Sequence, residues 1–425
     1  MEFLPESMNA GDTAWVLISA ALVLFMTPGL AFFYGGMVRA KHVLGMLMQN
    51  FFSMGLVSVL WAVVGYSLAF GGTNKWIGNF DFLGLKDAAS MYPADPSGVE
   101  WFALFTVPPI VFVAYQMMFA IITPALITGA IADRMRFSAW VWFLGLWSIL
   151  VYSPVAHWVF SPSGFLFDMG ALDFAGGTVV HINAGIAALV AVLVLGKRKG
   201  WPGKPMPPHS LPLTLLGTGI LWFGWFGFNA GSALGANFLS GQALMNTHLA
   251  ASAAMLSWLV VEKLKGGHAT TLGAASGAVA GLVAITPCAG FVGGLAGVAI
   301  GAIAGVVCFL AISLKNKFGY DDSLDVVGVH LVGGVVGSLL LGLFADQSAT
   351  GLGVDGMLFG GGTDLFIDQL VAVVVTLVFS GVLTFVILKV LQVALPGGIR
   401  VDEEDEERGL DLSQHSEVAY SYAER

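Results

Sequence analysis

Charged residues are scarce in this chain of 425 residues: Asp, Glu, Lys and Arg make up 11% of it, against about 25% in soluble domains. A soluble protein of this size needs a polar surface around its core, and so little charge cannot form one. The chain has 18 Lys and Arg residues and a formal net charge of −9. The composition therefore excludes a cytosolic enzyme. It also excludes a nucleic-acid-binding protein, because nucleic acid is bound mainly through positive charge.

Cysteine is also scarce. The chain has two cysteines, Cys288 and Cys308, and both lie in apolar stretches. A pair of this kind forms neither a disulfide framework nor a metal site. We therefore expect no metal and no cofactor in this protein.

Apolar residues, in contrast, make up 57% of the chain, and the mean hydropathy is +0.83. Only helices and closed barrels satisfy the backbone polar groups within lipid. The 56 glycines are typical of helices that pack closely through small residues in membranes. The composition therefore predicts an all-α polytopic membrane protein.

A spanning helix needs about 20 mostly apolar residues, and eleven segments of the chain meet this condition. They are residues 14–36, 43–70, 102–131, 137–160, 176–195, 211–232, 243–262, 268–287, 291–314, 326–345 and 366–395.

The positive charges predict the orientation, because Lys and Arg are enriched in cytoplasmic loops. With the N-terminus outside, the outside loops contain only Lys75 and Lys86. The other sixteen basic residues lie inside: Arg39, Lys41, Arg134, Arg136, Lys197, Arg198, Lys199, Lys204, Lys263, Lys265, Lys315, Lys317, Lys389, Arg400, Arg408 and Arg425. A miscount of one helix would scatter this pattern, so it supports eleven spans, an outside N-terminus and an inside C-terminus.

The motif V-H-x-x-x-G occurs twice, at His181 in the fifth predicted span and at His330 in the tenth. An aspartate precedes each histidine, Asp173 by eight residues and Asp325 by five. Five spans separate the two motifs, so their helices run in opposite directions, as in an inverted-topology repeat. The two histidines can meet only if both helices start below the membrane surface.

The composition changes at about Ile399, which divides the chain into a membrane domain, residues 1–398, and a cytoplasmic tail, residues 399–425. The halves of the membrane domain are residues 14–195 and 211–345, and the helix at 366–395 lies outside the repeat. The tail begins with an acidic run at residues 402–407. Charge patterning alone is also compatible with a simply solvated tail.

Ionisable residues within a membrane are costly and usually functional. The candidates are His157, Asp173, His181, His248 and His330. No acidic chain of the proton-pump type, arginine ladder or potassium-filter sequence is present. A pore through this protein is therefore expected to carry a neutral species through its centre.

The two repeated histidines allow two interpretations. Burial disfavours a protonated imidazole, and two neutral imidazoles could hydrogen-bond a small polar solute in a lumen. A buried histidine is also commonly a hydrogen-bonded core residue. Asp173 similarly fits a helix cap or a buried anion below an outer vestibule, and both roles are compatible.

Aromatic side chains share helix faces with these candidates. Tyr115 and Phe119 lie four residues apart on one face, and Trp225, Phe228 and Ser232 lie on one face of the sixth span. Such stripes are usually packing surfaces or interface belts. Ring faces beside a hydroxyl are also a cation–π cage for a small cation.

Over nearly its whole length the sequence resembles the ammonium transporter (Amt/Mep/Rh) family, and in particular its bacterial and archaeal Amt branch. The matching stretches are TPGLAFFYGGMVRAKHVLGMLMQN (27–50), AYQMMFA (114–120), YSPVAHW (152–158), ALDFAGGTVVHINAG (171–185), GWFGFNAGSA (224–233), DDSLDVVGVHLVGG (321–334) and GLDLSQHSEVAY (409–420).

The resemblance implies a role for each candidate. His181 and His330 would line the pore, and Phe119 and Phe228 would form a phenylalanine gate. The outer ammonium-recruitment region or pore wall would include Ser232, Phe160, Trp158, Tyr115 and Trp225. Asp173, Tyr152 and Gln116 match structural or electrostatic positions near the conduction path.

One position departs from the family pattern. Phe160 stands where the family commonly has a tryptophan. Phenylalanine is a weaker cation–π partner than tryptophan. We therefore expect the recruitment site to be weaker or differently arranged.

The resemblance also implies a homotrimer in the cell inner (cytoplasmic) membrane, with one pore in each subunit and a cytosolic PII-type regulatory protein as a partner of the tail. It predicts ammonium transport without enzyme activity. Captured ammonium would lose a proton, ammonia would cross the pore, and separate passage of the proton would make transport electrogenic. The alternatives are an electroneutral Rh-like ammonia channel and an ammonium sensor.

Overall fold

The computed structural model describes residues 8–86, 88 and 106–420. Over these residues the chain is helical and forms no strand, apart from one isolated antiparallel bridge between Met135 and Arg400. The predicted all-α fold is therefore confirmed. Residues 1–7 of the predicted outer segment, 102–105 of the predicted third span and 421–425 of the tail lie outside the described residues.

Ten helical segments among the described residues are long and apolar enough to cross a membrane. They are α1 (Ala10–Met37), α2 to α3 (Ala40–Phe70), α4 (Pro109–Ile131), α5 to α7 (Phe137–Met169), η6 to α8 (Gly177–Leu195), α9 with its final turn (Leu211–Ala233), α10 (Phe238–Gly266), α12 to α13 (Ala296–Phe318), η8 to α14 (Val327–Phe344) and α16 (Asp364–Ala394). Each coincides with a predicted span. The eighth predicted span contains the shorter apolar helix α11 (Thr271–Ile285), so the count of eleven crossings stays a prediction.

Several of these segments consist of shorter helices that follow one another. Their bounds are α2 (Val43–Leu60), α3 (Tyr66–Phe70), α5 (Phe137–Trp147), α6 (Ser153–Phe160), α7 (Phe165–Met169), η6 (Gly177–Ile182), α8 (Asn183–Leu195), α9 (Leu211–Ala230), α12 (Ala296–Ile312), α13 (Leu314–Phe318), η8 (Val327–Leu331) and α14 (Val332–Phe344). Outside the bundle lie α15 (Gln347–Thr350), α17 (Glu403–Arg408) and α18 (Leu410–His415).

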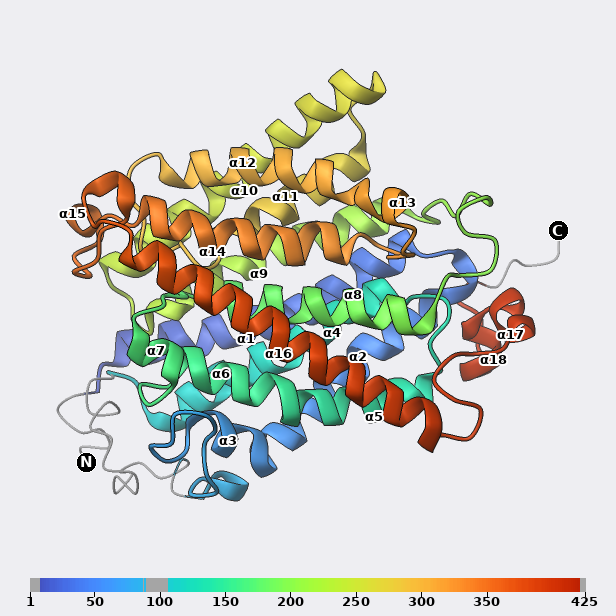
Figure 1. Cartoon of the computed structure of the whole chain (residues 1–425), viewed down its shortest axis with the longest axis horizontal. Coiled ribbons are helices and arrows are strands. Elements are labelled where there is room, and N and C mark those ends of the chain that lie inside the picture. The colour runs from blue at the N-terminus through green and yellow to red at the C-terminus, as the bar shows by residue number, and fades with distance from the viewer. Residues whose placement is uncertain (1–7, 87, 89–105, 421–425) are drawn as a thin grey trace.

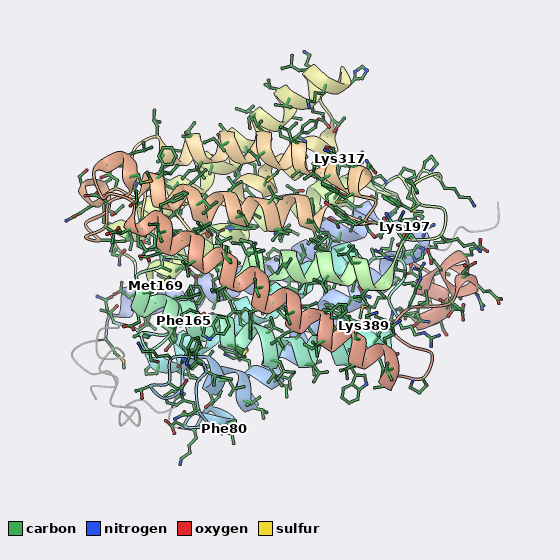
Figure 2. The ribbon with its side chains drawn as sticks, in the orientation of Figure 1. Phe80, Phe165, Met169, Lys197, Lys317 and Lys389 are labelled. Atoms are coloured by element: carbon green, nitrogen blue, oxygen red, sulfur yellow. The ribbon has the colours of Figure 1, made fainter. Side chains whose placement is uncertain are left out.

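The long helices lie side by side along the longest axis of the molecule (Figure 1). Helices α7 and α15 lie at one end of the bundle, and α13, α17 and α18 lie at the opposite end. Following the predicted orientation, we call the first the outer end and the second the inner end. Lys197 and Lys317 lie toward the inner end, whereas Phe165 lies toward the outer end (Figure 2).

Small residues allow α1 and α9 to pack along each other. A Cβ atom added at Gly217 in α9 would lie 2.6 Å from the carbonyl oxygen of Gly29 and 2.6 Å from the Cα atom of Phe33, both in α1. Gly219, two residues farther along α9, has open space around the same position. The helix contact therefore depends on a missing side chain at Gly217.

This difference gives a matched pair of variants. We expect Gly217→Ala to lower the free energy of unfolding by about 1–3 kcal/mol, because the added methyl group overfills the helix contact. Gly219→Ala should leave it unchanged or raise it by up to about 1 kcal/mol, since alanine favours helix more than glycine does. Thermal unfolding in detergent checks both, and equal melting temperatures for the two variants would contradict the packing argument.

Candidate functional site

The two repeated histidines lie in unusual helical turns. In η6 the backbone N–H of His181 donates to the carbonyl of Gly176, five residues earlier, at 3.1 Å. His330 lies in the corresponding wide turn, η8. Such π-helical turns are rare and often occur at functional sites.

Each of these turns packs against a helix from the other half of the chain. Helix α14 packs against η6, and α8 packs against η8, so each half contributes the neighbour of the other half's histidine. The ring centroids of His181 and His330 lie 5.3 Å apart, and their Nδ1 atoms are 3.3 Å apart. The structure therefore brings the two predicted pore histidines into contact, as an inverted repeat would.

The contact between the two Nδ1 atoms needs a single proton. One ring donates it and the other accepts it, so both rings can be neutral. His181 Nε2 is buried and has no hydrogen-bond partner among the described residues. This nitrogen is left for a solute.

A pair of phenylalanines lies on the outer side of the histidines. The ring centroids of Phe119 and Phe228 are 4.5 Å apart, and both side chains are buried. The Phe228 ring in turn stacks on His181 at 5.9 Å. These rings form a continuous stack from the outer side of the pair to the first histidine.

A cavity of about 320 Å³ opens on the outer side of this pair. Its wall is mostly aromatic and includes one hydroxyl and one amide. It is formed by Phe112, Tyr115, Gln116, Phe119, Phe160, Pro162, Phe167, Phe174, Ala175, Ser232 and Leu234. Phe112, Phe167 and Phe174 had not been predicted, because no regular spacing connects them in the sequence.

A much smaller cavity lies on the other side of the pair and contains the two histidines. It measures about 10 Å³, whereas one water needs roughly 10–15 Å³. Its wall is formed by Met26, Leu30, Phe33, Ile122, Leu126, Val180, His181, Leu221, Trp225, Phe228, Val279 and His330. We call this space the lumen. Its lining is apolar except for the imidazoles and the indole of Trp225.

The hydroxyls of Tyr115 and Ser232 meet at 3.1 Å in the wall of the outer cavity. Each also lies within hydrogen-bond distance of the carbonyl of Phe228, at 3.0 and 2.9 Å. When both donate to that carbonyl, the lone pairs of Ser232 Oγ remain free to accept a hydrogen bond from a cation.

The other predicted recruitment residues are distributed differently. Phe160 lines the outer cavity, but Trp225 lines the lumen and stacks on His181 at 5.5 Å. Trp158 lines neither of these cavities, and its indole N–H donates to the carbonyl of Trp76 at 2.6 Å. Tyr152 packs against Trp61 at 6.2 Å, away from both walls.

The carboxylate of Asp173, in the loop before η6, caps the N-terminal end of η6. One carboxylate oxygen accepts the N–H groups of Gly176 and Gly177, both at 2.7 Å, and the other accepts those of Thr178 and Val179 at 2.8 and 3.3 Å. Burial raises the pKa of this carboxyl, and the backbone donors oppose the shift. The contacts fit the capping interpretation, and an additional electrostatic role stays a prediction.

The equivalent residue in the second half is Asp322. Asp322 precedes His330 by eight residues, the spacing between Asp173 and His181, and it accepts the N–H of Val327 at 2.7 Å. Asp325, which the repeated motif had suggested as the counterpart of Asp173, instead binds Lys315. The equal spacing of eight was the signal in the sequence, and the adjacent acids obscured it. Burial and the neighbouring Asp325 raise the pKa of Asp322.

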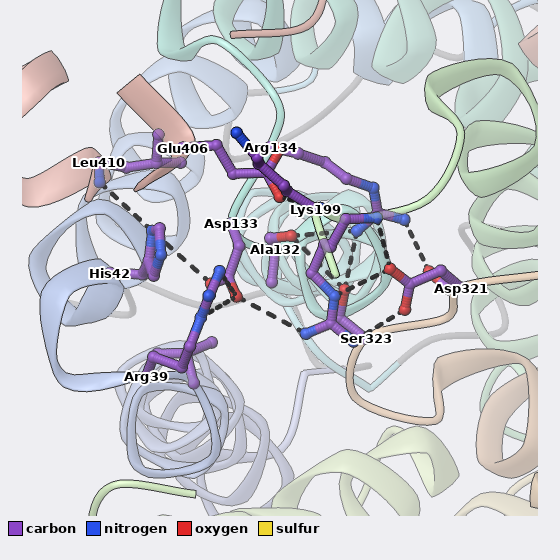
Figure 3. Close-up of polar contacts among 12 residues, drawn as sticks. Arg39, His42, Ala132, Asp133, Arg134, Lys199, Asp321, Ser323, Glu406 and Leu410 are labelled. Carbon is purple, nitrogen blue, oxygen red and sulfur yellow. Dashed lines mark hydrogen bonds and ion pairs between the residues drawn. The ribbon is translucent and has the colours of Figure 1, made fainter. Parts of the chain in front are cut away.

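A network of buried charges ties the loops together at the inner end (Figure 3). Asp133 binds Arg39 at 3.0 Å and lies 3.6 Å from Arg198, and Arg198 binds Asp321 at 2.8 Å. Burial alone would raise the pKa of Asp321, but hydrogen bonds and charge from Arg198 hold it below its ordinary value. These loops come from both halves of the chain, so the network fixes the halves against each other.

The tail joins this network. Glu406 is buried and binds Arg400 at 2.8 Å and the backbone N–H of Lys199 at 2.6 Å. Asp411 accepts the N–H of Gly45 at 2.8 Å, at the start of α2. The tail is therefore docked on the inner loops and is not simply solvated. In the part of the chain that the structure describes, no three His, Cys, Asp or Glu side chains gather as a metal site.

Comparisons with known proteins find similarity over most of the chain. Residues 14–420 match the model of the Ammonium Transporter Family. An ammonium transporter of Mycobacterium tuberculosis (strain H37Rv) is 52% identical over 439 residues, which cover 98% of this chain and 91% of that protein. The crystal structure of Candida albicans Mep2 is similar with a TM-score of 0.87 and 35% identity, covering 94% of this chain and 88% of that chain. A structure titled Sensor Amt Protein has a TM-score of 0.85 and 29% identity, covering 95% and 98%.

The two aspartate caps give a second prediction. Asp322→Ala and Asp173→Ala should each destabilise the protein by about 1–2 kcal/mol, because they leave helix-start N–H groups without an acceptor. Asp→Asn at either position keeps one acceptor oxygen and should lose less. Thermal unfolding of the four variants checks this order. If Asn were as destabilising as Ala at both positions, charge and not capping would be the contribution of these residues.

Proposed function

The chain belongs to the ammonium transporter family, and we propose that it carries ammonium as ammonia through the lumen that Phe119 and Phe228 close on the outer side. It is an ammonium transporter and a multi-pass membrane protein, not an enzyme. The observation that carries the proposal is the contrast between the two cavities. The outer cavity is large and mostly aromatic, and Ser232 Oγ can accept a hydrogen bond in it. The lumen is almost closed and mostly apolar.

Capture takes place in the outer cavity. An ammonium ion there faces the ring of Phe160 and donates a hydrogen bond to Ser232 Oγ. Cation–π attraction contributes about 0.5–2 kcal/mol for one ring, depending on desolvation. The rings of Phe167 and Phe174 enclose the same space and provide further attraction.

Deprotonation follows at or above the phenylalanine pair. An ion without partners in an apolar interior costs many kcal/mol, whereas a neutral molecule loses only its hydrogen bonds. Ammonia can then donate to or accept from the imidazoles of His181 and His330. The proton crosses separately, so that transport is electrogenic.

The same cost gives selectivity. A potassium ion matches ammonium in charge but has no proton to release. Neutral imidazoles offer it little in place of its water shell. We therefore propose that the lumen excludes potassium because it contains no anion.

Two alternatives have distinct outcomes. An electroneutral Rh-like ammonia channel would give ammonia flux without current. An ammonium sensor would bind ammonium with little flux, and the similarity to the structure titled Sensor Amt Protein keeps this alternative in view. Ammonium-evoked current in proteoliposomes that contain only this protein distinguishes all three.

We also propose a homotrimer in the cytoplasmic membrane, with one pore in each subunit. The docked tail places Lys199, Glu403 and Glu407 together at the inner end. A PII-type regulatory protein that binds there would contact both the tail and the basic loop at residues 197–204. No nucleic acid is involved.

The histidine variants test the selectivity mechanism. We predict that His181→Asp or His330→Asp produces a potassium current, because a carboxylate can hold a cation in the lumen and is shorter than imidazole. The parent protein should carry ammonium current and no potassium current. Matched ammonium and potassium pulses on the same proteoliposomes measure both.

His248→Asp is a matched control, since His248 lies on the exposed face of α10 and not in the lumen. This variant should remain impermeable to potassium. If both lumen variants also remained impermeable while still carrying ammonium, the histidines would not be the selectivity element.

A second variant tests capture. Phe160→Trp should lower the half-saturation concentration for ammonium about two- to fivefold, because tryptophan is the stronger cation–π partner. The expected gain of about 0.5–1 kcal/mol is the size of one such contact at an exposed site. The maximal rate should change little. Titration of the ammonium current measures this, and an unchanged half-saturation concentration would show that Phe160 does not set the affinity.

A further inference from the structure

The outer cavity is larger than ammonium requires. It measures about 320 Å³, whereas one water, which is similar in size to ammonium, takes up roughly 30 Å³ in the liquid. Sites for small organic molecules typically have volumes of about 300–1,000 Å³ and a mostly apolar lining with a few polar groups. The outer cavity therefore has the size and the lining of a site for a small organic molecule.

Six aromatic rings line this cavity, and they come from four parts of the chain. They are Phe112, Tyr115 and Phe119 of α4, Phe160 at the end of α6, Phe167 of α7 and Phe174 in the loop before η6. The three rings of α4 are buried, whereas Phe167 is 48% exposed. Rings therefore line the cavity from its buried floor at Phe119 to its exposed edge at Phe167.

No ionised side chain balances a cation in this cavity. The described residues that line it include no Asp, Glu, Lys, Arg or His. The polar groups of the wall are the amide of Gln116 and the hydroxyls of Tyr115 and Ser232, and both hydroxyls lie within hydrogen-bond distance of the carbonyl of Phe228. A cation with N–H groups on all sides finds few acceptors here, so attraction to the rings is the main interaction that the wall offers.

A quaternary ammonium ion fits such a wall better than ammonium does. It has no N–H group, so it needs no acceptor in the wall in exchange for water. Its alkyl groups also gain from the burial of their apolar surface. Aromatic cages are the recurring protein sites for ions of this kind.

We infer that the outer cavity is a binding site for small quaternary ammonium ions, of which tetramethylammonium is the simplest, and that these ions inhibit transport by occupying it. Such an ion has no proton to release, so it cannot become neutral. The rings of Phe119 and Phe228, whose centroids lie 4.5 Å apart, and the lumen of about 10 Å³ leave no passage for it. Binding rests on the cavity alone. Inhibition rests on the proposed function, because it assumes that ammonium is captured in the same cavity.

The first measurement is binding to the purified protein in detergent, which requires no transport. Equilibrium dialysis compares choline with neohexyl alcohol, its neutral analogue in which a carbon atom replaces the charged nitrogen, and protein-free micelles serve as the blank. We expect choline to bind about tenfold more tightly, because its charge interacts with more than one ring. Equal affinities would show that the cavity only accepts apolar groups of this size and would overturn the recognition of the cation.

The second measurement is the ammonium current of proteoliposomes. Tetramethylammonium should raise the half-saturation concentration for ammonium in proportion to its own concentration and leave the maximal current unchanged, because the two ions compete for one site. Given alone, it should evoke no current. Either a lowered maximal current or a current carried by tetramethylammonium itself would overturn the inhibitory role.

Two variants separate the two ligands. Ser232→Ala removes the hydroxyl that ammonium uses as an acceptor, so the half-saturation concentration for ammonium should rise about tenfold, whereas tetramethylammonium should bind as before. Phe167→Leu keeps an apolar side chain at the edge of the cavity but removes the ring, and it should weaken tetramethylammonium binding about two- to fivefold. Phe80→Leu is the matched control, since Phe80 is an exposed phenylalanine that does not line the cavity, and it should change neither affinity.

Each outcome decides one part of the inference. If Ser232→Ala weakened both ions equally, or if Phe167→Leu changed the affinity for tetramethylammonium no more than Phe80→Leu does, the assignment to this cavity would be wrong. If a variant does not fold, the binding and competition measurements on the wild type decide. Ammonium current without any binding of tetramethylammonium in large excess would overturn the inference alone. Absence of ammonium current from the wild type would contradict the proposed function and leave the binding result standing.

Discussion

The cost of leaving a charge or a polar group without a partner in an apolar interior is the constraint on which this structure depends. At the inner end it is met by pairing, where Asp133, Asp321 and Glu406 each face an arginine. In the lumen it can be met without any charge, because the contact between the two Nδ1 atoms needs a single proton. At His157 it is met by two backbone carbonyls, those of Ala69 and Asn74, which lie 2.8 and 2.6 Å from the ring nitrogens.

The position of the paired histidines follows from the same constraint. A helix that starts inside a membrane exposes N–H groups that no preceding turn satisfies. Asp173 and Asp322 accept these groups at the starts of η6 and η8. Because the two carboxylates satisfy both starts, the two wide turns can face each other and bring the Nδ1 atoms of the imidazoles to 3.3 Å.

Much of this fold could be predicted from the sequence, because the helices follow the hydropathy along the chain. Every predicted span contains a helix, and the repeated V-H-x-x-x-G motif located the paired histidines. What could not be predicted depends on side-chain direction. Trp225 shares a helix face with Ser232, but the aromatic stack places it in the lumen and not in the outer cavity. Trp158 turns its N–H toward the carbonyl of Trp76.

The contacts of the His157 ring could not be predicted for a different reason. Its partners are backbone carbonyls, and a carbonyl leaves no trace in the identity of the residue that carries it. Asp322 was obscured because three aspartates crowd within five residues, and only the contacts separate the cap from the partner of Lys315. Residue types therefore predict which side chains can form polar contacts, while the geometry of the backbone decides which partners they meet.

In the mechanism that we propose, the two cavities contribute to transport through different kinds of interaction. Attraction in the outer cavity depends on ring faces and one hydroxyl, which favour any small cation and so set affinity more than identity. In this proposal discrimination takes place in the lumen, because ammonium can release a proton before it enters and potassium cannot. The proposal therefore allows the affinity of the outer cavity for cations to change without admitting potassium, because the Phe119 and Phe228 rings, whose centroids lie 4.5 Å apart, would separate the two steps.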